Sequence, residues 1–346
     1  MDKPRVFLAP LDLCGIYACL TRGLREIGCK ADFLSLGTDA NGAWDHRDSS
    51  LMIRLFIRVR RLFVSTRDLS AKNPIRPLVT LLYVISELIF LLSVALSYDV
   101  VVLKSGETIS KTGWEMRLFR LFRRTVVAFF HGSDSRPPYL RRPLDGETPE
   151  ELERSVRQTW ERVRKVDKLA DYVIENPLSS HNHVRECCVY QIVGNVVDGR
   201  KLAIGSESAS PQRRSDVVRV LHAPSNPELK GTALIRQYIE SLRAKGYKID
   251  YVELSGATNE DVVNAINDCD LVVHQLYSDI QAAVFATEAY AIGRPVLVGG
   301  YGIADMRQFV PAEAIAPTYF VHPDEFEGQL ELLARFVKLG LELQLY

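Results

Sequence analysis

The stretch Glu288-Ala-Tyr-Ala-Ile-Gly-Arg-Pro-Val-Leu-Val298 decides the predicted fold, because it joins a short helix to a buried strand. Glu288 lies five residues before Gly293, so we expect the helix to end at that glycine and the chain to restart as a strand over 294–298. This alternation holds the Glu288 carboxylate at the mouth of an α/β crevice. Taken alone, the stretch also fits a plain helix stop followed by a core strand.

A turn upstream carries the opposite charge. An apolar strand is predicted over 217–222, and after a polar loop Lys230-Gly231-Thr232 opens an amphipathic helix over 231–244. A lysine beside a glycine at a helix N-terminus stabilises an anion through free N–H groups, the helix dipole and its own charge. A carboxylate in the same crevice accepts hydrogen bonds from ribose hydroxyls. The two features together suit a nucleotide diphosphate, whereas Lys230 alone also fits a solvated surface lysine.

Three pieces carry a family resemblance, in the order His222-Ala-Pro-Ser-Asn226 with Leu229-Lys-Gly-Thr232, then Asp270-Leu-Val-Val-His-Gln-Leu276, then Glu288-Ala-Tyr-Ala-Ile-Gly-Arg-Pro-Val296. In this order and spacing the chain resembles the retaining glycosyltransferases of family 4, which have the GT-B fold. The resemblance is good over about 217–300. It implies that Lys230 binds the donor diphosphate and Glu288 the nucleotide ribose. The donor-binding residues predicted in this half are Asn226, Lys230, Gly231, Gln275 and Glu288.

The sequence departs from the family pattern at two points. The family carries a further glutamate eight residues before Glu288, where this chain has Ile280, with Asp279 one place off. The family also has a glycine-rich loop here, whereas 278–283 contains no glycine. The first departure concerns a carboxylate that contacts the sugar, and the second a backbone cradle for phosphate. An unusual donor, or reduced or lost activity, stays open.

Composition predicts two domains and a local basic surface. With 346 residues, of which 47% are hydrophobic, the chain is long enough for two cores. The formal net charge is +0, yet residues 51–142 hold sixteen Lys or Arg against six Asp or Glu. Membrane lipid and nucleic acid are the candidate partners of such a surface.

The cysteines and the N-terminus predict a cytosolic protein. The six cysteines show no metal-ligand spacing and are expected to be free thiols in a reducing compartment: Cys14, Cys19, Cys29, Cys187, Cys188 and Cys269. We expect no metal and no cofactor besides the donor. The chain enters a strand at Arg5 without the apolar region of a signal peptide. The predicted location is the cytosol or the cytosolic face of a membrane.

The N-terminal half opens as a βαβ unit of Rossmann type. A strand is predicted over 5–9, a helix over 16–27 and a second strand over 30–36. Gly15 lies in the first strand-to-helix turn, where the GT-B resemblance brings backbone close to donor or acceptor. A single glycine also fits an ordinary turn.

Two basic amphipathic segments flank a long apolar run. The segment 52–63 places Arg54, Arg58 and Arg61 at helical spacing, and the segment 114–124 contains Arg120, Arg123 and Arg124. This composition is typical of helices that lie at a membrane interface. We therefore predict an anionic membrane surface as partner. Nucleic acid is the weaker candidate, because no binding motif is present and the arginines alternate with bulky apolar residues.

The run 78–97 contains one charge, Glu87, and is long enough to span a bilayer. A central charge disfavours a span, and the run flows into a buried strand over 98–104. Three interpretations stay open: a transmembrane span, a peripheral or partly embedded helix, and a buried domain helix. We prefer the second.

A strand over 125–130 delivers His131 to the carboxyl edge of the first sheet. The family resemblance implies that this histidine faces the donor sugar and the acceptor. Asp134 and Arg136 lie in the same loop, and we predict that the three form the catalytic set. A structural role for His131 is the alternative, as for most single histidines.

The rest of the chain completes two α/β domains. In the first, a helix is predicted over 150–170 and strands over 172–177 and 189–193. The second continues with strands over 249–254 and 270–275, helices over 258–267 and 284–292, and a helical tail over 323–346. We assign 1–198 to an acceptor and membrane-associated domain, 199–216 to a linker and 217–346 to the donor domain.

The predicted fold class is therefore α/β, of GT-B type, with two facing Rossmann-like domains and an inter-domain cleft. The predicted function is transfer of a sugar from a nucleotide diphosphate sugar to a membrane-linked acceptor, in cell-envelope polysaccharide or glycolipid biosynthesis, retaining and metal-independent. A non-catalytic GT-B-like subunit that docks on a membrane complex or partner transferase is the alternative. A sugar epimerase of this fold is a third possibility.

Overall fold

The computed structural model describes most of the chain, namely residues 3–11, 15–36, 49–66, 73–105, 107–110, 113–131, 134–138, 147–176, 179, 182–189, 195–197, 199, 216–278, 280–309, 312 and 315–339. The chain divides into two compact units. One consists of Met1–Phe130 with Arg164–Ile174, and the other of His131–Val163 with Glu175–Tyr346. The predicted linker 199–216 lies, between its two end residues, outside the described residues.

The first sheet has six strands in the order β2-β1-β3-β4-β5-β6. Its strands are β1 (Arg5–Ala9), β2 (Lys30–Phe33), β3 (Val100–Lys104), β4 (Thr125–Phe129), β5 (Tyr172–Glu175) and β6 (Cys188–Val189). The pairs β1·β2, β1·β3, β3·β4 and β4·β5 are all parallel. Parallel strands joined by helices are what alternating apolar runs and amphipathic segments predict, so this part of the fold prediction is confirmed.

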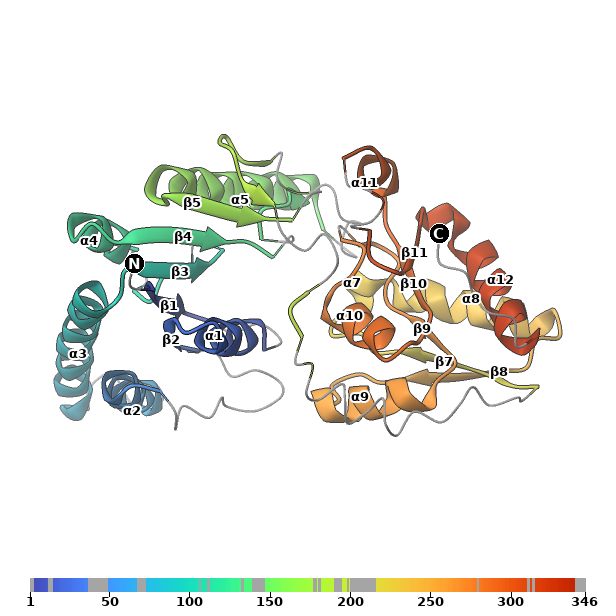
Figure 1. Cartoon of the computed structure of the whole chain (residues 1–346), viewed down its shortest axis with the longest axis horizontal. Coiled ribbons are helices and arrows are strands. Elements are labelled where there is room, and N and C mark those ends of the chain that lie inside the picture. The colour runs from blue at the N-terminus through green and yellow to red at the C-terminus, as the bar shows by residue number, and fades with distance from the viewer. Residues whose placement is uncertain are drawn as a thin grey trace. The chain divides into compact units, whose positions relative to one another are not determined.

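Helices cover both faces of the first sheet (Figure 1). Phe7 of β1 packs on Phe90 of α3 (Ile75–Ser97), with ring centroids 5.9 Å apart, whereas Phe129 of β4 packs on Tyr17 of α1 (Ile16–Glu26) at 6.0 Å. In the strand register Phe7 and Phe129 point to opposite faces, so α1 and α3 lie on opposite sides. The remaining helices are α2 (Leu51–Ser65), α4 (Glu115–Leu121) and α5 (Pro149–Leu169).

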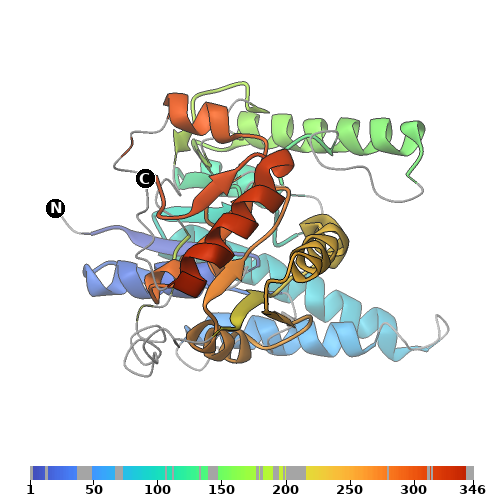
Figure 2. The ribbon, with the colours of Figure 1, turned by 90° about the vertical axis from the view of Figure 1, so that its right-hand side faces the viewer.

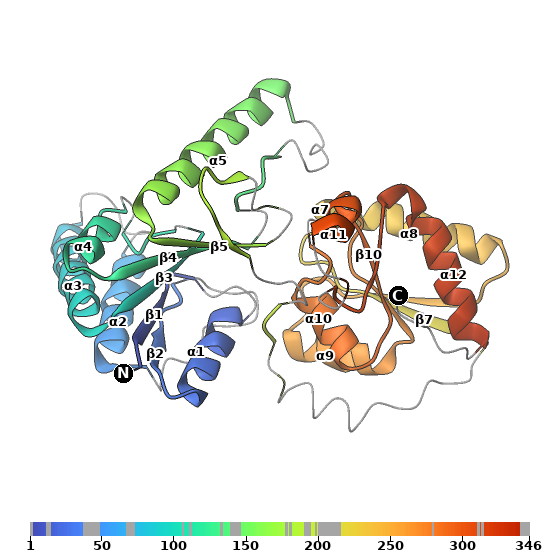
Figure 3. The same ribbon diagram turned by 45° about the horizontal axis from the view of Figure 1, so that its top comes forward.

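The second sheet has five strands in the order β11-β10-β9-β7-β8, and its pairs are parallel. The strands are β7 (Val218–His222), β8 (Ile249–Glu253), β9 (Leu271–Val273), β10 (Val296–Gly299) and β11 (Tyr319–Val321). One apolar cluster packs α8 (Thr232–Ala244) and α12 (Phe326–Leu339) on one face. A second cluster packs α9 (Asn259–Asp268) and α10 (Val284–Ala291) on the other face (Figure 3).

The tail belongs to the same helical layer as α8. After a short 3₁₀ turn, Pro323–Glu325, α12 runs beside α8 across the five-stranded sheet (Figure 2). Glu327 accepts a hydrogen bond from Ser241 at 2.7 Å, and Glu331 pairs with Lys245 at 2.7 Å. The tail is thus a turn and a helix, not one continuous helix, and residues 340–346 lie outside the described residues.

The structure also corrects the predicted elements at the end of the second sheet. The strand predicted over 294–298 begins at Val296, because the N–H of Arg294 still donates to the carbonyl of Ala289 in α10 at 2.9 Å. The buried Arg294 side chain donates to the carbonyl of Ile266 at 3.2 Å, capping the end of α9. A further strand, β11, was not predicted. Two short helices, α7 (Pro227–Lys230) and α11 (Ile303–Phe309), were also missed. Of the strand predicted over 189–193, only its first residue is described.

Candidate functional site at the carboxyl edge of the second sheet

Two successive caps lead from β7 into α8. Asn226 accepts a hydrogen bond from the N–H of Leu229 at 3.1 Å and so starts the short helix α7, which ends at Lys230. Gly231 then adopts φ 73°, a left-handed conformation that favours glycine, and serves as the first cap of α8. A glycine cap leaves no side chain over the N–H groups of the first turn of α8. These donors and the adjacent Lys230 make this end of the helix suited to an anion.

Lys230 is held toward the end of β9. Its ammonium donates to the side-chain oxygen of Gln275, and its carbonyl accepts from the N–H of Leu276 at 3.0 Å. The structure therefore brings Asn226, Lys230, Gly231 and Gln275 together. Their binding of a donor stays a prediction. A neutral amide oxygen is a weaker partner for an ammonium than a phosphate oxygen, so this contact can be exchanged for a ligand.

Three glycines make the close approach of these loops possible. A Cβ at Gly231 would lie 2.8 Å from the Cβ of Leu276. A Cβ at Gly299 would lie 2.4 Å from the carbonyl oxygen of Leu276, and one at Gly300 would lie 2.4 Å from that of Ser278. The segment 275–278 is thus clamped between the α7–α8 turn and the end of β10.

His222, at the end of β7, forms hydrogen bonds to both β9 and α8. Its Nδ1 lies 2.9 Å from the carbonyl oxygen of Val273, and its Nε2 lies 2.9 Å from the hydroxyl of Thr232. Nδ1 therefore carries the proton and donates to β9, while Nε2 accepts from the first residue of α8. Burial lowers the pKa of His222, which keeps the ring neutral. This histidine is a structural strut of the site.

Glu288 lies on α10, on the other helical layer of the sheet. It is only 7% exposed, and its carboxylate accepts from the side-chain amide of Asn259 at 2.9 Å. Asn259 is the first residue of α9, which begins at a capping box formed by Thr258 and Asp261. The predicted ribose-binding carboxylate is therefore buried and already oriented. Asn259 was not predicted, since a polar residue in a first turn gives no signal beyond capping.

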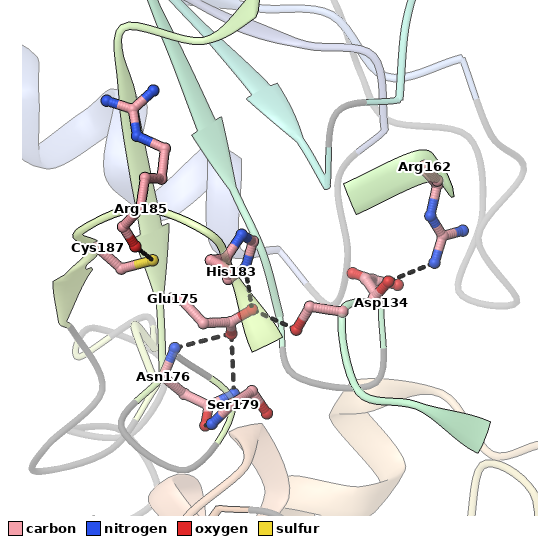
Figure 4. Close-up of polar contacts among 9 residues, drawn as sticks. Asp134, Arg162, Glu175, Asn176, Ser179, His183, Arg185 and Cys187 are labelled. Carbon is pink, nitrogen blue, oxygen red and sulfur yellow. Dashed lines mark hydrogen bonds and ion pairs between the residues drawn. The ribbon is translucent and has the colours of Figure 1, made fainter. Parts of the chain in front are cut away.

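The loop after β4 is anchored by a buried carboxylate. Glu175, at the end of β5, accepts from the backbone N–H of Asn176 at 2.8 Å and from its side-chain amide at 3.0 Å, and its other oxygen lies 3.3 Å from Nε2 of His183 (Figure 4). The hydroxyl of Ser135 donates to this same oxygen. Glu175 and His183 have fully buried side chains. Neither residue was predicted as functional, because neither lies in a recognisable motif.

Two anchors hold the backbone beside the predicted catalytic residues. The hydroxyl of Ser135 binds Glu175, and the carbonyl of Asp134 accepts from the guanidinium of Arg162 on α5. The structure therefore places Asp134 and Arg136 on either side of an anchored residue, and His131 at the start of the same loop, directly after the buried Phe130. All three predicted residues are half-buried.

Comparison with solved structures identifies the fold. The catalytic domain of starch synthase IV from Arabidopsis thaliana, bound to ADP and acarbose, matches with a TM-score of 0.50 and 10% identity over 99% of this chain and 96% of that chain. The chain has the GT-B fold.

Two further solved structures match with lower TM-scores. Anabaena HepE in complex with UDP and glucose matches with a TM-score of 0.49 and 11% identity, over 97% of this chain and 90% of that chain. Sucrose-phosphate synthase from Thermosynechococcus elongatus matches with 0.46 and 13%, over the same shares. No family model and no curated protein matches the chain. The assignment of the GT-B fold therefore rests on architecture and not on sequence identity.

In the N-terminal part of this GT-B chain, Gly15 caps α1 with φ 82°, and its carbonyl accepts from the N–H of Cys19 at 2.9 Å. The conformation explains why glycine stands there. Gly15 belongs to the first unit and the residues around Lys230 to the second. Its predicted contact with the donor stays a prediction.

The six predicted membrane-binding arginines differ in their surroundings. Arg54, Arg58 and Arg61 are exposed on α2, and Arg120 and Arg123 are exposed at the end of α4. Arg124, in contrast, is half-buried and donates to the carbonyl of Ala95 at 2.6 Å, with Asp99 at 3.4 Å. Arg124 therefore caps the C-terminal turn of α3, where a cation also complements the helix dipole.

Among the residues that the structure describes, no group of three or more His, Cys, Asp or Glu side chains has an arrangement that would hold a metal ion.

Replacement of Gly299 by alanine should destabilise the protein, because the added Cβ meets the Leu276 carbonyl at 2.4 Å and Phe326 at 2.9 Å. We expect the free energy of unfolding to fall by about 2 kcal/mol, measured by urea denaturation. Gly328→Ala is the matched control, since nothing lies within 4 Å of its Cβ position on α12. It should raise stability by up to about 1 kcal/mol. Equal effects of the two changes would contradict the clamp.

Proposed function

We propose that this chain is a glycosyltransferase that takes a sugar from a nucleotide diphosphate sugar. The observation that carries the proposal is Lys230 beside the glycine-capped N-terminus of α8, at the carboxyl edge of a parallel sheet. Ligands of open α/β sheets bind at this edge. The GT-B structure of starch synthase IV was solved with ADP and acarbose, a nucleoside diphosphate and a saccharide, which supports the same ligand class here.

The chemistry of the site suits departure of a diphosphate. As the bond to the anomeric carbon breaks, negative charge develops on the leaving phosphate, and the ammonium of Lys230 with the N–H groups of α8 stabilises it. Lys230 would exchange Gln275 for a phosphate oxygen in this step. Glu288, oriented by Asn259, would accept hydrogen bonds from the ribose hydroxyls. This scheme needs no metal ion, and family resemblance favours retention at the anomeric carbon.

On the acceptor side we assign His131, Asp134 and Arg136. Their loop is anchored through Ser135 to Glu175 and through Asp134 to Arg162, so the backbone that carries these side chains is held in place. A rigid backbone favours orientation of reacting groups, which is a large part of the catalysis of group transfer. Their proposed role is to orient the donor sugar and the acceptor hydroxyl.

A panel of UDP, GDP, ADP, CMP and dTDP sugars tests the donor site by calorimetry, with release of the free sugar as a second readout. We expect one nucleotide class to bind, and Lys230→Ala to weaken its binding by roughly 30-fold, because one charge-assisted contact of about 2 kcal/mol is lost. Lys338→Ala, which removes an exposed lysine from α12, is the control and should bind as wild type. Identical affinities for the two variants would refute the assignment of Lys230.

We further propose that the acceptor is linked to a membrane, on which the first unit rests at the cytoplasmic side. Apolar side chains cover an exposed face of α3: Leu78, Leu81, Leu82, Val84, Ile85, Leu88 and Ile89. Of the most apolar eighteen-residue window of this helix, only 28% is buried. The hydroxyls of Thr80 and Ser86 donate back to helix carbonyls, each at 2.8 Å, so they need no water. This surface is suited to hydrocarbon.

The packing of α3 favours a partly embedded helix over a span. From Phe90 onward the helix buries Phe90, Leu91, Val94 and Ala95 in the core of the first unit. The preceding part, from Ile75, extends roughly 22 Å at 1.5 Å per residue. That is shorter than the hydrocarbon core of about 30 Å. Stacking of Phe56 on Phe90 and of Phe63 on Tyr83, both at 4.4 Å, holds α2 alongside.

The exposed arginines of α2 supply the attraction to anionic lipid. Arg54, Arg58 and Arg61 share the exposed side of α2 with Leu51, Leu55 and Leu62. Basic groups beside exposed leucines combine charge attraction with insertion, which is how interfacial helices bind.

Charge reversal at Arg54, Arg58 and Arg61 to Glu should weaken binding to vesicles of phosphatidylserine and phosphatidylcholine. We expect a loss of about 3 kcal/mol, roughly a hundredfold, because each basic group near an anionic surface contributes about 1 kcal/mol. The measurement is co-flotation. Reversal of three exposed arginines of α5, Arg154, Arg157 and Arg164, is the control of equal charge. If both triple variants bind equally, the surface assignment is wrong.

A non-catalytic GT-B-like subunit is the second candidate, and one observation favours it. Ile280 stands where the family has a sugar-contacting glutamate, and it is only 9% exposed, so an apolar contact replaces a carboxylate. Asp279, the nearest acid, lies outside the described residues. Release of sugar from a bound donor would favour the enzyme, and donor binding without turnover would favour the subunit.

A further inference from the structure

His274 is a buried histidine whose ring has no hydrogen-bond partner. It directly follows β9, and its backbone N–H donates to the carbonyl of Leu297 at 2.9 Å, which fixes its place in the sheet. The residue is only 5% exposed. Within the described part of the chain, neither Nδ1 nor Nε2 of the ring has a partner. Its ring contact is with Phe285, whose centroid lies 5.8 Å away.

His222 shows what a structural histidine looks like at the same sheet edge. It ends the neighbouring strand β7, is fully buried, and uses both ring nitrogens, one toward Val273 and one toward Thr232. Buried polar groups in folded proteins are paired as a rule, because an unpaired one loses its hydrogen bonds to water without replacement. Among the described residues, both ring nitrogens of His274 are unpaired, whereas both ring nitrogens of the neighbouring His222 are paired. This difference indicates that His274 lacks a partner.

The surroundings of His274 indicate which partner is missing. The next residue, Gln275, is bound by Lys230, and Phe285 lies on α10 one turn before Glu288. His274 thus directly precedes the partner of the proposed diphosphate-binding lysine and contacts the helix that carries the proposed ribose-binding glutamate. Burial and the nearby Lys230 and His222 lower the pKa of His274 well below its usual value, so the ring is neutral. A neutral imidazole offers one donor and one acceptor, as a hydroxyl group requires.

We propose that His274 binds a hydroxyl group of the nucleotide-sugar donor, donating with one ring nitrogen and accepting with the other. The proposal rests on the proposed function and adds to it a residue inside the sheet edge that was assigned no role of its own. The hydroxyl belongs either to the ribose or to the transferred sugar, and the chemistry is the same for both. In the absence of donor the buried ring has lost its hydrogen bonds to water without replacement. It regains hydrogen bonds only when the donor binds.

The test compares His274→Leu with His222→Leu and His274→Asn, by thermal unfolding and by calorimetry with the donor and with its nucleoside diphosphate. We expect His274→Leu to unfold at the wild-type temperature or above, because an unpaired polar group is removed, and to bind the donor roughly tenfold more weakly. His222→Leu should unfold at a lower temperature. His274→Asn, which keeps a donor and an acceptor, should recover part of the affinity.

The two sources of the hydroxyl are separated by the ligand. Weaker binding of the nucleoside diphosphate itself by His274→Leu assigns the ribose, and a loss seen only with the intact donor assigns the transferred sugar. Wild-type affinity in His274→Leu for both ligands would overturn the inference. So would a fall in unfolding temperature equal to that of His222→Leu, which would show a structural partner. Failure of the proposed function is distinct, since wild type would then bind no member of the panel, and the inference would fall with it.

Discussion

The hydrogen bond from the N–H of Leu276 to the carbonyl of Lys230 joins the α7–α8 turn to the end of β9, and the candidate site depends on it. The two backbones approach this closely only because residue 231 has no Cβ, which would otherwise meet Leu276 at 2.8 Å. The same approach brings Gln275 within reach of the Lys230 ammonium and leaves the first N–H groups of α8 uncovered by a capping side chain. One steric condition thus sets the position of the charge and of the dipole.

Two histidines beside this contact, His222 and His274, are neutral, and the carboxylate of Glu288 is paired. His222 binds β9 and α8 through both nitrogens, and His274 lies beside it without a partner among the described residues. Burial lowers the pKa of both rings, and the charge of Lys230 lowers it further, so both rings are neutral at neutral pH. Glu288 is buried and oriented by Asn259. Such an arrangement suits the proposed binding of a diphosphate by a cation and of hydroxyl groups by a fixed acceptor.

Much of the fold could be predicted because its signals are local. The periodicity of apolar residues located β1 and α8 within a residue or two of their bounds, and the strand–helix alternation predicted parallel sheets. The Lys230–Gly231 turn could be predicted because a glycine and a lysine at the start of a helix are typical of an anion-binding site. Strand β11 could not, since three residues between prolines carry no period, and its pairing of Phe320 with Val298 is tertiary. The role of Arg294 could not be predicted either. In sequence it belongs to the apolar run of a strand, and its hydrogen bond to α9 is a tertiary contact. The difference between His222 and His274 is invisible in sequence, because it depends on what surrounds each ring.

Hydrogen exchange of the full chain, with and without the nucleotide sugar that binds it, locates the donor site on the protein. We expect the donor to slow amide exchange at the start of α8, over 231–235, and in the segment 274–278, because the ligand covers those N–H groups and stabilises the clamp between them. We also expect slower amide exchange at the start of α10. Slowed exchange confined to other strands, or none in these segments at a saturating donor concentration, would contradict the assignment of the donor site to this edge of the sheet.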